Sequence, residues 1–475
     1  MIGGLTQSHH FTERGLVMRT AMLTTGFALG ALAAGAMVQQ RSAIAANGVT
    51  VNVHTIHREV IPSFSRQTGL ACNQCHTTFP QLTAFGRRFK LNGYTLTRLQ
   101  MVEAGDTANR SLKINLIPPV SAMVQASISQ TSKAQPGAQN GNVELPQEMS
   151  IFLGEEITPR LGTFLQFTYS AADGSFGFDN ADLRYANQGK LGSKELIYGF
   201  SLNNNPTVQD LWNTTPAWGF PWAESGVAPT PAAATLIEGG LAQQVAGLGA
   251  YAMWDNHVYG EFSVYRSAQQ GGLHPPGVTA SDTSHNILRG VAPYWRAALQ
   301  HTWGPQYLEL GTYGMSTRLY PAGVTGPTDR YTDVALDAQY ERKVGKGSIT
   351  AHTTWIHEAQ NLPASVGTAS TNLSNTLKTF KIDGSYYTAG RVGMTVSYFS
   401  RTGDADALRY PGSVTGSPNS NGVVGELDFL PWLNTRFVVQ YVTYGKFDGA
   451  RSNYDGSGRN ASDNNTLYLL TWLVF

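Results

Sequence analysis

Polar and apolar residues alternate along much of the chain beyond residue 110. Residues 331–341 show the pattern clearly, with acidic or amide side chains at one set of positions and apolar side chains at the other. The polar set is Asp333, Asp337, Gln339 and Glu341, and the apolar set is Val334, Leu336, Ala338 and Tyr340. A period of two predicts β-strands that have one polar face and one apolar face.

Sixteen such segments are predicted, and their connections are alternately short and long. The predicted strands are 112–127, 147–157, 161–170, 176–186, 194–203, 243–254, 257–266, 290–302, 307–316, 330–342, 348–358, 376–387, 392–402, 421–430, 435–445 and 465–475. Tight turns are expected at Pro159-Arg160, Asp255-Asn256, Gly304-Pro305, Gly345-Lys346-Gly347, Ala389-Gly390 and Pro431-Trp432. Longer connections rich in Gly, Ser, Asn and Pro include 204–242, 267–289, 403–420 and 446–464. This arrangement predicts an all-β fold, a 16-stranded antiparallel transmembrane β-barrel over residues 111–475.

A barrel of this kind implies a particular compartment. Lipid offers no hydrogen-bond partners, so a sheet that crosses it must close on itself. We expect the lipid bilayer of the outer membrane of a Gram-negative bacterium. An even number of strands then places the N- and C-termini on the periplasmic side, with the short turns. The last strand ends in Phe475, which resembles the recognition signal of bacterial outer-membrane barrels.

The connection 204–242 differs from the other long loops. It is dense in aromatic residues and proline, including Trp212, Trp218 and Trp222. Two interpretations are open: by analogy with porins, the loop folds inward and constricts the pore, or it is stiffened for stability at the surface.

Composition agrees with a membrane barrel. Charged residues make up 14% of the chain, against roughly a quarter in soluble domains. Glycine and tyrosine are abundant, at 51 and 21 residues. The net charge of +1 gives no support for nucleic acid as a partner. The chain is also too long to be one small domain, so a second structural unit is expected beside any such domain.

The N-terminus has the features of an export signal. Arg14 and Arg19 precede a charge-free run over residues 20–38, and residues 43–45 form an A-x-A cleavage site. We predict a cleaved signal peptide over residues 1–45, with a membrane anchor as the alternative.

The only two cysteines lie in the pentapeptide Cys72-Asn73-Gln74-Cys75-His76. C-x-x-C-H is the attachment motif for c-type haem, in which both thiols add to vinyl groups and the histidine ligates the iron. A redox C-x-x-C and half of a zinc site are the alternatives. The first would need a thioredoxin-like βαβ context and the second further Cys or His ligands, and neither is evident. We therefore predict one covalently bound haem c, held by Cys72, Cys75 and His76.

Residues 46–110 are predicted to form a small α-helical monohaem cytochrome c segment. Near-helical spacing gives it an apolar face that can line the haem, made of Phe79, Leu82, Phe85, Phe89 and Leu91. Arg87, Arg88 and Lys90 either pair with the haem propionates or are solvated.

The second axial ligand of the iron is not determined. His54 and His57 lie upstream of the motif and Met101 lies downstream. A barrel residue, or an open sixth position, is equally compatible with the sequence. Methionine would raise the reduction potential relative to a second histidine.

The region Pro62–Tyr94 resembles the fused outer-membrane cytochrome c–porin family of iron-oxidising bacteria. The matching motifs are R-Q-T-G over 66–69, C-x-x-C-H over 72–76, and F-P-x-L-T-x-F-G-R-x-F-K-L-x-G-Y over 79–94, ahead of a predicted sixteen-stranded barrel. The resemblance implies a single haem in or near the barrel mouth that accepts electrons from extracellular Fe(II).

Three functions follow as hypotheses. The leading one is an oxidoreductase-like electron conduit, in which Fe(II) or another reduced donor outside the cell reduces the haem and a periplasmic cytochrome receives the electron. The second is a solute porin with a haem-containing plug or redox gate. The third is outward electron export to metals. Asp333, Asp337 and Glu341 either bind iron or are ordinary carboxylates of a wet lumen. No P-loop or free cysteine nucleophile suggests a hydrolase.

Overall fold

The computed structural model describes most of the chain beyond the N-terminal region. The described residues are 62–95, 103–104, 112–113, 119–171, 174–267, 286–321, 323, 325–388 and 391–475. The predicted signal peptide, His54, His57, Met101 and the turn Ala389-Gly390 lie outside them.

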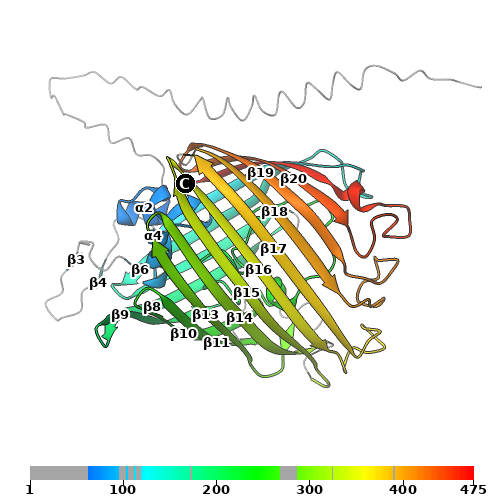
Figure 1. Ribbon diagram of the computed structural model, residues 1–475, viewed down its shortest axis with the longest axis horizontal. Helices are drawn as coiled ribbons and strands as arrows, with labels where there is room; N and C mark the ends of the chain where they lie inside the picture. Colours follow the sequence, from blue (N-terminus) through cyan, green and yellow to red (C-terminus); the bar gives the residue numbers. More distant parts are fainter. Residues whose placement is uncertain are drawn as a thin grey trace, which may run out of the picture. The chain divides into compact units, whose positions relative to one another are not determined.

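The predicted sixteen-stranded antiparallel barrel is confirmed (Figure 1). Its long strands are β5 Val120–Thr131, β6 Asn142–Thr158, β7 Leu161–Ser170, β8 Ser175–Leu191, β9 Lys194–Asn203, β10 Val245–Trp254, β11 Val258–Ser267, β13 Ala292–Trp303, β14 Gln306–Tyr320, β15 Asp329–Val344, β16 Gly347–Asn361, β17 Ser374–Thr388, β18 Val392–Gly403, β19 Ser420–Trp432, β20 Thr435–Lys446 and β21 Thr466–Val474. The two-residue strand β12, Ile287–Leu288, pairs with the far end of β14. The barrel closes where β21 pairs with β5, with Val474 opposite Met123 and Thr466 opposite Thr131.

Two sequence predictions about the strands are wrong in detail. The predicted strand 112–127 enters the barrel only at Val120, and its start, β4 (Leu112–Lys113), pairs with β3 (Glu103–Ala104). Pro118 and Pro119 stand before Val120, and proline has no N–H to donate to a barrel neighbour.

The second error concerns the predicted turn Pro431-Trp432. Strand β19 runs through both residues to Trp432, and the register shifts between Phe429 and Trp432. Such an irregularity accommodates a proline inside a strand. The turn is therefore made by Leu433 and Asn434.

The predicted tight turns that the structure describes lie at one end of the barrel, because alternate connections of an antiparallel barrel share an end. The predicted turn at Asp255-Asn256 is confirmed, and both residues have a positive φ, of 51° and 54°. Two successive left-handed residues match the right-handed twist of a hairpin, and Asp and Asn tolerate that conformation. The C-terminal Phe475 lies at this same end, where its N–H donates to the Ala122 carbonyl at 2.8 Å.

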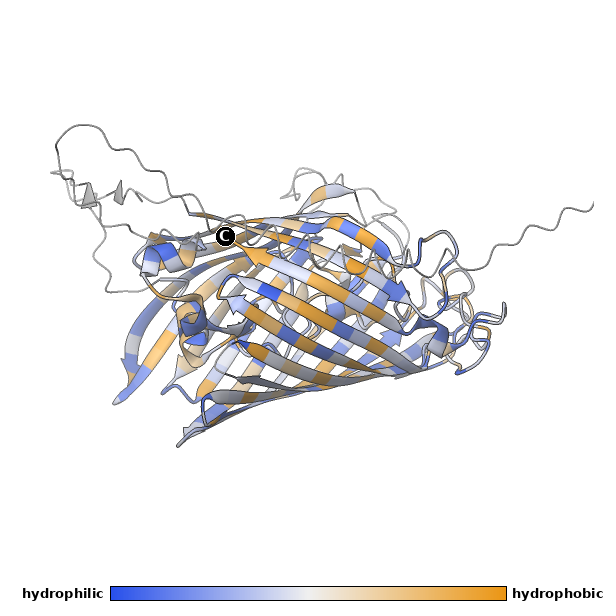
Figure 2. Ribbon diagram, turned by 90° about the horizontal axis from the view of Figure 1, so that it is seen from above, coloured by the Kyte–Doolittle hydropathy of each residue, from blue (hydrophilic) through white to orange (hydrophobic). Residues whose placement is uncertain are grey.

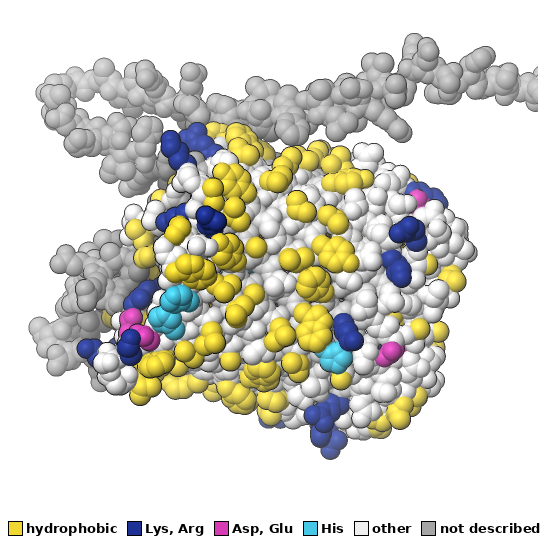
Figure 3. All heavy atoms as spheres, in the orientation of Figure 1, with side chains coloured by type: hydrophobic (Ala, Val, Ile, Leu, Met, Phe, Trp, Pro, Cys, Tyr) yellow, Lys and Arg dark blue, Asp and Glu magenta, His cyan; other side chains and the backbone are white. Residues whose placement is uncertain are grey.

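The barrel wall has an apolar outer face and a polar inner face. On β15, Asp333 and Asp337 point inward and are buried, whereas Val334 and Leu336 point outward and are 43% and 56% exposed. Figure 2 shows this alternation along the strands, and Figure 3 shows an outer wall with many apolar and few charged side chains. An apolar exterior on a closed barrel is the arrangement that lipid requires.

No helix within the described part of the chain is long and apolar enough to span a membrane.

Residues 204–244, which connect β9 to β10, fold into the lumen and are called here the inward loop. Trp212 is fully buried, and its indole Nε1 donates to the Tyr307 hydroxyl on β14 at 2.6 Å. The loop also reaches the opposite wall, where Gln440 on β20 donates to the Ala223 carbonyl at 3.1 Å. The inward-folding interpretation of this connection is therefore the correct one.

Residues 62–95, called here the N-terminal segment, form one compact unit with the barrel. They contain α2 (Ser63–Thr68), α3 (Cys72–Cys75), α4 (Ala84–Leu91) and the small pair β1 (His76–Thr78) and β2 (Gln81–Leu82). The Ser63 N–H donates to Ser121 Oγ at the start of β5, at 2.6 Å. The segment therefore lies at the short-turn end of the barrel, beside Phe475 (Figure 1).

A cation on the outer wall tests the lipid-facing assignment. Leu336 is in the middle of β15, and we expect Leu336→Arg to destabilise the folded barrel in vesicles by about 2–4 kcal/mol. Val344 ends the same strand, and Val344→Arg should cost only about 0–1 kcal/mol because the cost falls toward the interface. Urea unfolding of both variants measures the difference. Equal losses would show that the wall does not face lipid.

Candidate functional site

The two cysteine thiols lie on one helical turn. Cys72 and Cys75 are the ends of α3, and residues three apart on a helix share a face. Both are free thiols that line the same cavity. Ser65 Oγ lies 3.7 Å from Cys72 Sγ. Burial, with Cys72 as a smaller cause, raises the pKa of the Cys75 thiol to about 11.

These properties bear on the alternatives to haem attachment. A redox-active C-x-x-C needs one thiol with a lowered pKa, and Cys75, whose pKa is raised, does not supply it. A zinc site needs further ligands, and no cluster of three or more Cys, His, Asp or Glu able to hold a metal occurs among the described residues. The donor set of two adjacent thiols and one histidine fits haem c better than it fits a redox C-x-x-C or a zinc site.

The histidine of the motif is in a form that can bind iron. Burial lowers the pKa of His76 to about 4, so its imidazole is neutral near pH 7. The carbonyls of Pro80 and Gln81 oppose this shift, but neither makes a hydrogen bond of normal geometry to the buried Nδ1. The ring lies against Phe79, with 4.8 Å between the ring centroids. A neutral ring retains the nitrogen lone pair that a metal ligand must donate.

Helix α4 fixes the position of the motif. Thr83 is its N-cap, and the Thr83 hydroxyl accepts from the Gly86 N–H at 3.2 Å. The Thr83 N–H donates to the Cys75 carbonyl at 2.9 Å. Gly86 permits this contact, because a Cβ there would lie 2.2 Å from the Cys75 oxygen. Another glycine of this kind is Gly154 on β6, where a Cβ would lie 2.7 Å from the Phe64 ring.

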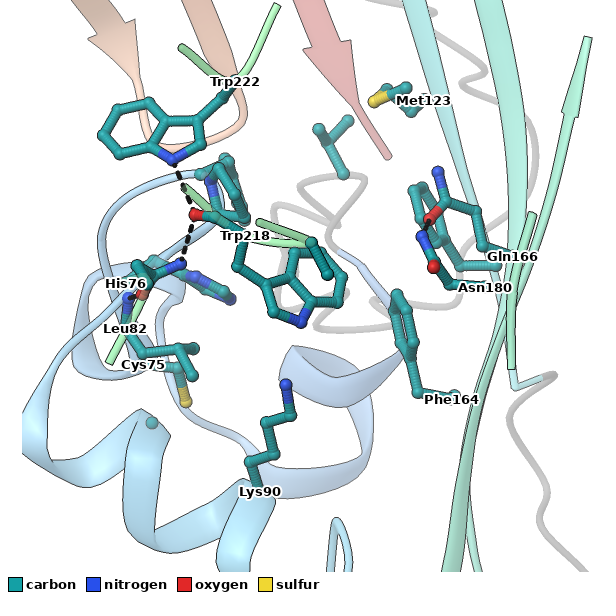
Figure 4. Close-up of a pocket in the computed structure, with 18 of the residues that line it drawn as sticks. Cys75, His76, Leu82, Lys90, Met123, Phe164, Gln166, Asn180, Trp218 and Trp222 are labelled. Carbon is teal, nitrogen blue, oxygen red and sulfur yellow. Dashed lines mark hydrogen bonds between the residues drawn. The ribbon is translucent and has the colours of Figure 1, made fainter. Parts of the chain in front are cut away.

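A cavity of about 570 Å³ opens beside the motif (Figure 4). This volume is within the range of roughly 300–1,000 Å³ that is typical of cofactor sites. Three parts of the chain form its walls: the N-terminal segment, the inner faces of β5–β8 with the end of β21, and the inward loop. Its aromatic lining consists of Phe64, Phe79, Phe89, Tyr94, Phe152, Phe164, Trp218, Trp222 and Trp472.

The predicted apolar face of the cytochrome segment is only partly correct. Phe79, Leu82 and Phe89 line the cavity. Phe85 does not and is 40% exposed, whereas Leu91 is buried against the barrel in a cluster with Trp212 and Tyr251. Helix α4 lies between the cavity and the barrel wall, so Phe89 faces the cavity whereas Leu91 packs against the wall.

Two of the three cations suggested for haem propionates are bound to the barrel instead. Arg87 pairs with Glu341 on β15, and Arg88 Nη2 lies 2.6 Å from a Glu195 carboxylate oxygen on β9. Neither arginine lines the cavity, although Lys90 does.

Lys90 is held by the inward loop. Its Nζ donates to the Val208 and Asp210 carbonyls, each at 2.7 Å, and lies 4.8 Å from the centre of the Trp218 ring. Burial, followed by the nearby Arg184, lowers the pKa of Lys90 to about 7.

The inward carboxylates of β15 do not converge on a metal centre within the described chain. Asp337 lies 2.6 Å from Arg296 of β13, and Glu341 pairs with Arg87. Asp333 is buried and lies opposite Glu358 of β16. Asp337 and Glu341 are therefore members of structural ion pairs.

Sequence reasoning missed the barrel side of the cavity. Ser121, Met123 and Gln125 reach it from β5, and Trp472 and Val474 reach it from β21. These residues show only the period-two alternation shared by every strand, and their meeting depends on which strands close the barrel. For the wall formed by the inward loop, the high density of aromatic residues in its sequence was the one available indication.

Replacement of the buried glycine tests the docking of the motif. We expect Gly86→Ala to destabilise the N-terminal segment by about 1–3 kcal/mol, because the added methyl group overlaps the Cys75 carbonyl. Ala84→Gly is the matched control in the same helix, with an expected cost of about 0.5–1 kcal/mol from helix propensity alone. Hydrogen exchange of the amides of α3 and α4 measures both. Faster exchange in Ala84→Gly than in Gly86→Ala would contradict the close contact between Gly86 and the Cys75 carbonyl.

No protein-family model matches this sequence, and no curated protein matches it. Among solved structures, the anion-selective porin from Comamonas acidovorans has a TM-score of 0.45 at 12% identity, with 75% of this chain and 98% of that chain covered. The channel DcaP of Acinetobacter baumannii has a TM-score of 0.44 at 12% identity, with 75% and 96% covered. OmpT of Vibrio cholerae has a TM-score of 0.40 at 10% identity, with 75% and 96% covered. Likeness at this level concerns architecture and does not extend to activity.

Proposed function

We propose that this protein is an outer-membrane electron conduit with one haem c at the short-turn end of its barrel. In this proposal the short-turn end is periplasmic, an extracellular reduced donor such as Fe(II) supplies electrons, and a periplasmic cytochrome accepts them. Cys72 and Cys75 would hold the haem through thioether bonds, and His76 would ligate its iron. When bound, the haem would supply reversible one-electron transfer.

The surroundings of the motif support haem attachment. Each thiol would add its S–H across one vinyl group, so the two need to lie on one face of α3 with space beside them. The aromatic cavity provides that space, and its rings would shield part of a porphyrin from water, which is one way in which a protein sets the potential of a haem. The neutral imidazole of His76 is available without loss of a proton.

The observation that carries the conduit function is that the inward loop lies in the lumen beside the motif and is bonded to the N-terminal segment. The Leu82 N–H donates to Asn213 Oδ1 of the inward loop at 2.9 Å, so the N-terminal segment and the loop are joined. Asp210 of the loop lies 3.4 Å from Arg296 on the barrel wall. A lumen occupied in this way would hinder the passage of solutes, whereas electrons could cross it by way of a redox centre.

Fe(II) is a reasonable donor for such an arrangement. Ferric iron precipitates at neutral pH, so its formation outside the cell avoids deposits in the periplasm. A barrel whose lumen is occupied by protein would keep iron out of the periplasm and let only electrons pass. The carboxylates Asp333, Asp337 and Glu341 are not needed for this step, since electron transfer requires no acid or base.

The alternative is a solute porin with a haem-containing plug or redox gate. The same occupied lumen supports it, provided that the N-terminal segment and the inward loop move when the haem changes oxidation state. Outward electron export to metals would use the conduit in reverse, and the reduction potentials of haem and partner decide its direction.

Optical spectroscopy of the full-length protein in detergent tests the proposal. The protein should be coloured, and ferrous salt should convert the oxidised haem spectrum to the reduced one. The double variant Cys72→Ser/Cys75→Ser should carry no covalent haem after denaturation. A colourless wild-type protein, or a haem that ferrous salt leaves oxidised, would contradict the proposal.

Single-channel conductance separates the conduit from a solute porin. We expect wild-type protein in planar bilayers to conduct poorly. Asp210→Ala should raise conductance several-fold, because Asp210 pairs with Arg296 and accepts the N–H groups of Trp212, Thr214 and Thr215. Arg296 keeps Asp337 as a partner, so the cost falls on the backbone N–H groups that lose their acceptor, about 1–3 kcal/mol for each one left buried, and this would loosen the loop.

The matched control for conductance is Asp455→Ala. Asp455 likewise accepts backbone N–H groups, from Ser457 and Arg459, but it lies in the loop that joins β20 to β21, outside the inward loop. Its replacement should leave conductance unchanged. High conductance in the wild type would favour the porin alternative.

A further inference from the structure

The inward face of β5 contains one residue that does not match its neighbours. Its buried inward positions alternate with an apolar outer row of alanine, valine and isoleucine. Five of the six inward side chains are polar, and Met123 is the exception, 4% exposed; the polar ones are Ser121, Gln125, Ser127, Ser129 and Thr131. A thioether in a row of hydroxyl and amide groups suggests a specific requirement at this position.

Met123 lies on the wall of the cavity that contains the haem-attachment motif. Figure 4 shows it across the pocket from Cys75 and His76, with its sulfur on the side that faces them. Phe79 connects the two sides, since it lies against the His76 ring and also packs on the apolar cluster that contains Met123. The sulfur has one weak polar contact, from Gln125 Nε2 at 3.7 Å.

The other potential iron ligands around the cavity are less suitable. Among the described residues that line it, His76 is the only histidine and Met123 the only methionine. The thiols are used in attachment, and Lys90 Nζ is occupied by two backbone carbonyls. Glu148 and Asp179 offer hard oxygen atoms, whereas haem iron of electron-transfer proteins is bound by imidazole and thioether groups.

We propose that the Met123 thioether would be the second protein ligand of the haem iron, in addition to His76. This inference rests on the proposed haem c site and adds a barrel residue to it. Ligation by methionine raises the reduction potential relative to histidine, which favours acceptance of an electron from a reduced donor. It would also attach the haem to both parts of the protein, by thioether bonds to the N-terminal segment and by the iron–sulfur bond to the barrel wall.

A packing role is the competing explanation. Met123 belongs to an apolar cluster with Val438, Leu470, Trp472 and Val474, and methionine often fills irregular gaps. In that case leucine, which has a similar volume, would replace it without effect on the iron.

The experiment compares Met123→Leu and Met123→His with the wild type, as full-length haem-loaded protein in detergent. The ferric wild type should show the weak long-wavelength absorption band of a sulfur–iron bond. Both variants should lose this band and have a lower reduction potential. Their covalent haem content should equal that of the wild type, because Cys72 and Cys75 are retained.

Met253→Leu is the matched control. Met253 on β10 is also an inward, buried methionine, 2% exposed, whose sulfur has one amide contact, from Gln300 Nε2 at 3.9 Å. It does not line the cavity, so its replacement should leave band and potential unchanged. The variants His54→Ala, His57→Ala and Met101→Ala complete the series, and each should keep the band.

The outcomes separate this inference from the proposed function. An unchanged band and potential in Met123→Leu, or loss of the band in one of the His54, His57 or Met101 variants alone, would overturn ligation by Met123 while the haem c site stands. A wild type with covalent haem but no sulfur band would overturn it as well. A wild type without covalent haem would overturn both.

Discussion

Closure of the barrel between β21 and β5 is the pairing on which the rest of the structure depends. In lipid an unpaired strand edge is too costly, so the first and last strands must meet. Their register places Val474 opposite Met123, and both side chains enter the cavity. The same seam receives the N-terminal segment, through the bond from Ser63 to Ser121. The seam that seals the barrel is thus also a wall of the candidate haem site.

The lumen is organised by charged groups that lie far from water. Arg296 is fully buried and contacts Asp210 of the inward loop as well as Asp337 of the wall. Arg87 joins the N-terminal segment to the barrel in the same way, through Glu341. Buried pairs of this kind add little net stability, but loss of one partner is expensive. They therefore specify where the loop and the segment sit, which determines the shape of the cavity between them.

Much of the barrel could be predicted from sequence because lipid and lumen impose a strict period of two on each strand. The errors arose where a strand ends or is irregular, at Val120 and at Pro431, because alternation does not say where pairing stops. The motif at 72–76 could be identified because attachment of haem c is a local requirement on adjacent residues. The opposite wall of the site could not. Met123 follows the ordinary alternation of β5, and only the closed barrel brings it to the cavity that His76 lines.

The central claim is that a porphyrin lies inside the barrel mouth, between α3 and the β5–β21 seam. A density map of the intact protein in detergent, obtained by electron cryomicroscopy, tests this most directly. Planar density should be joined to Cys72 and Cys75, with a strong central peak beside His76 and within the aromatic cavity. An empty cavity, or a porphyrin bound outside the barrel wall, would contradict it.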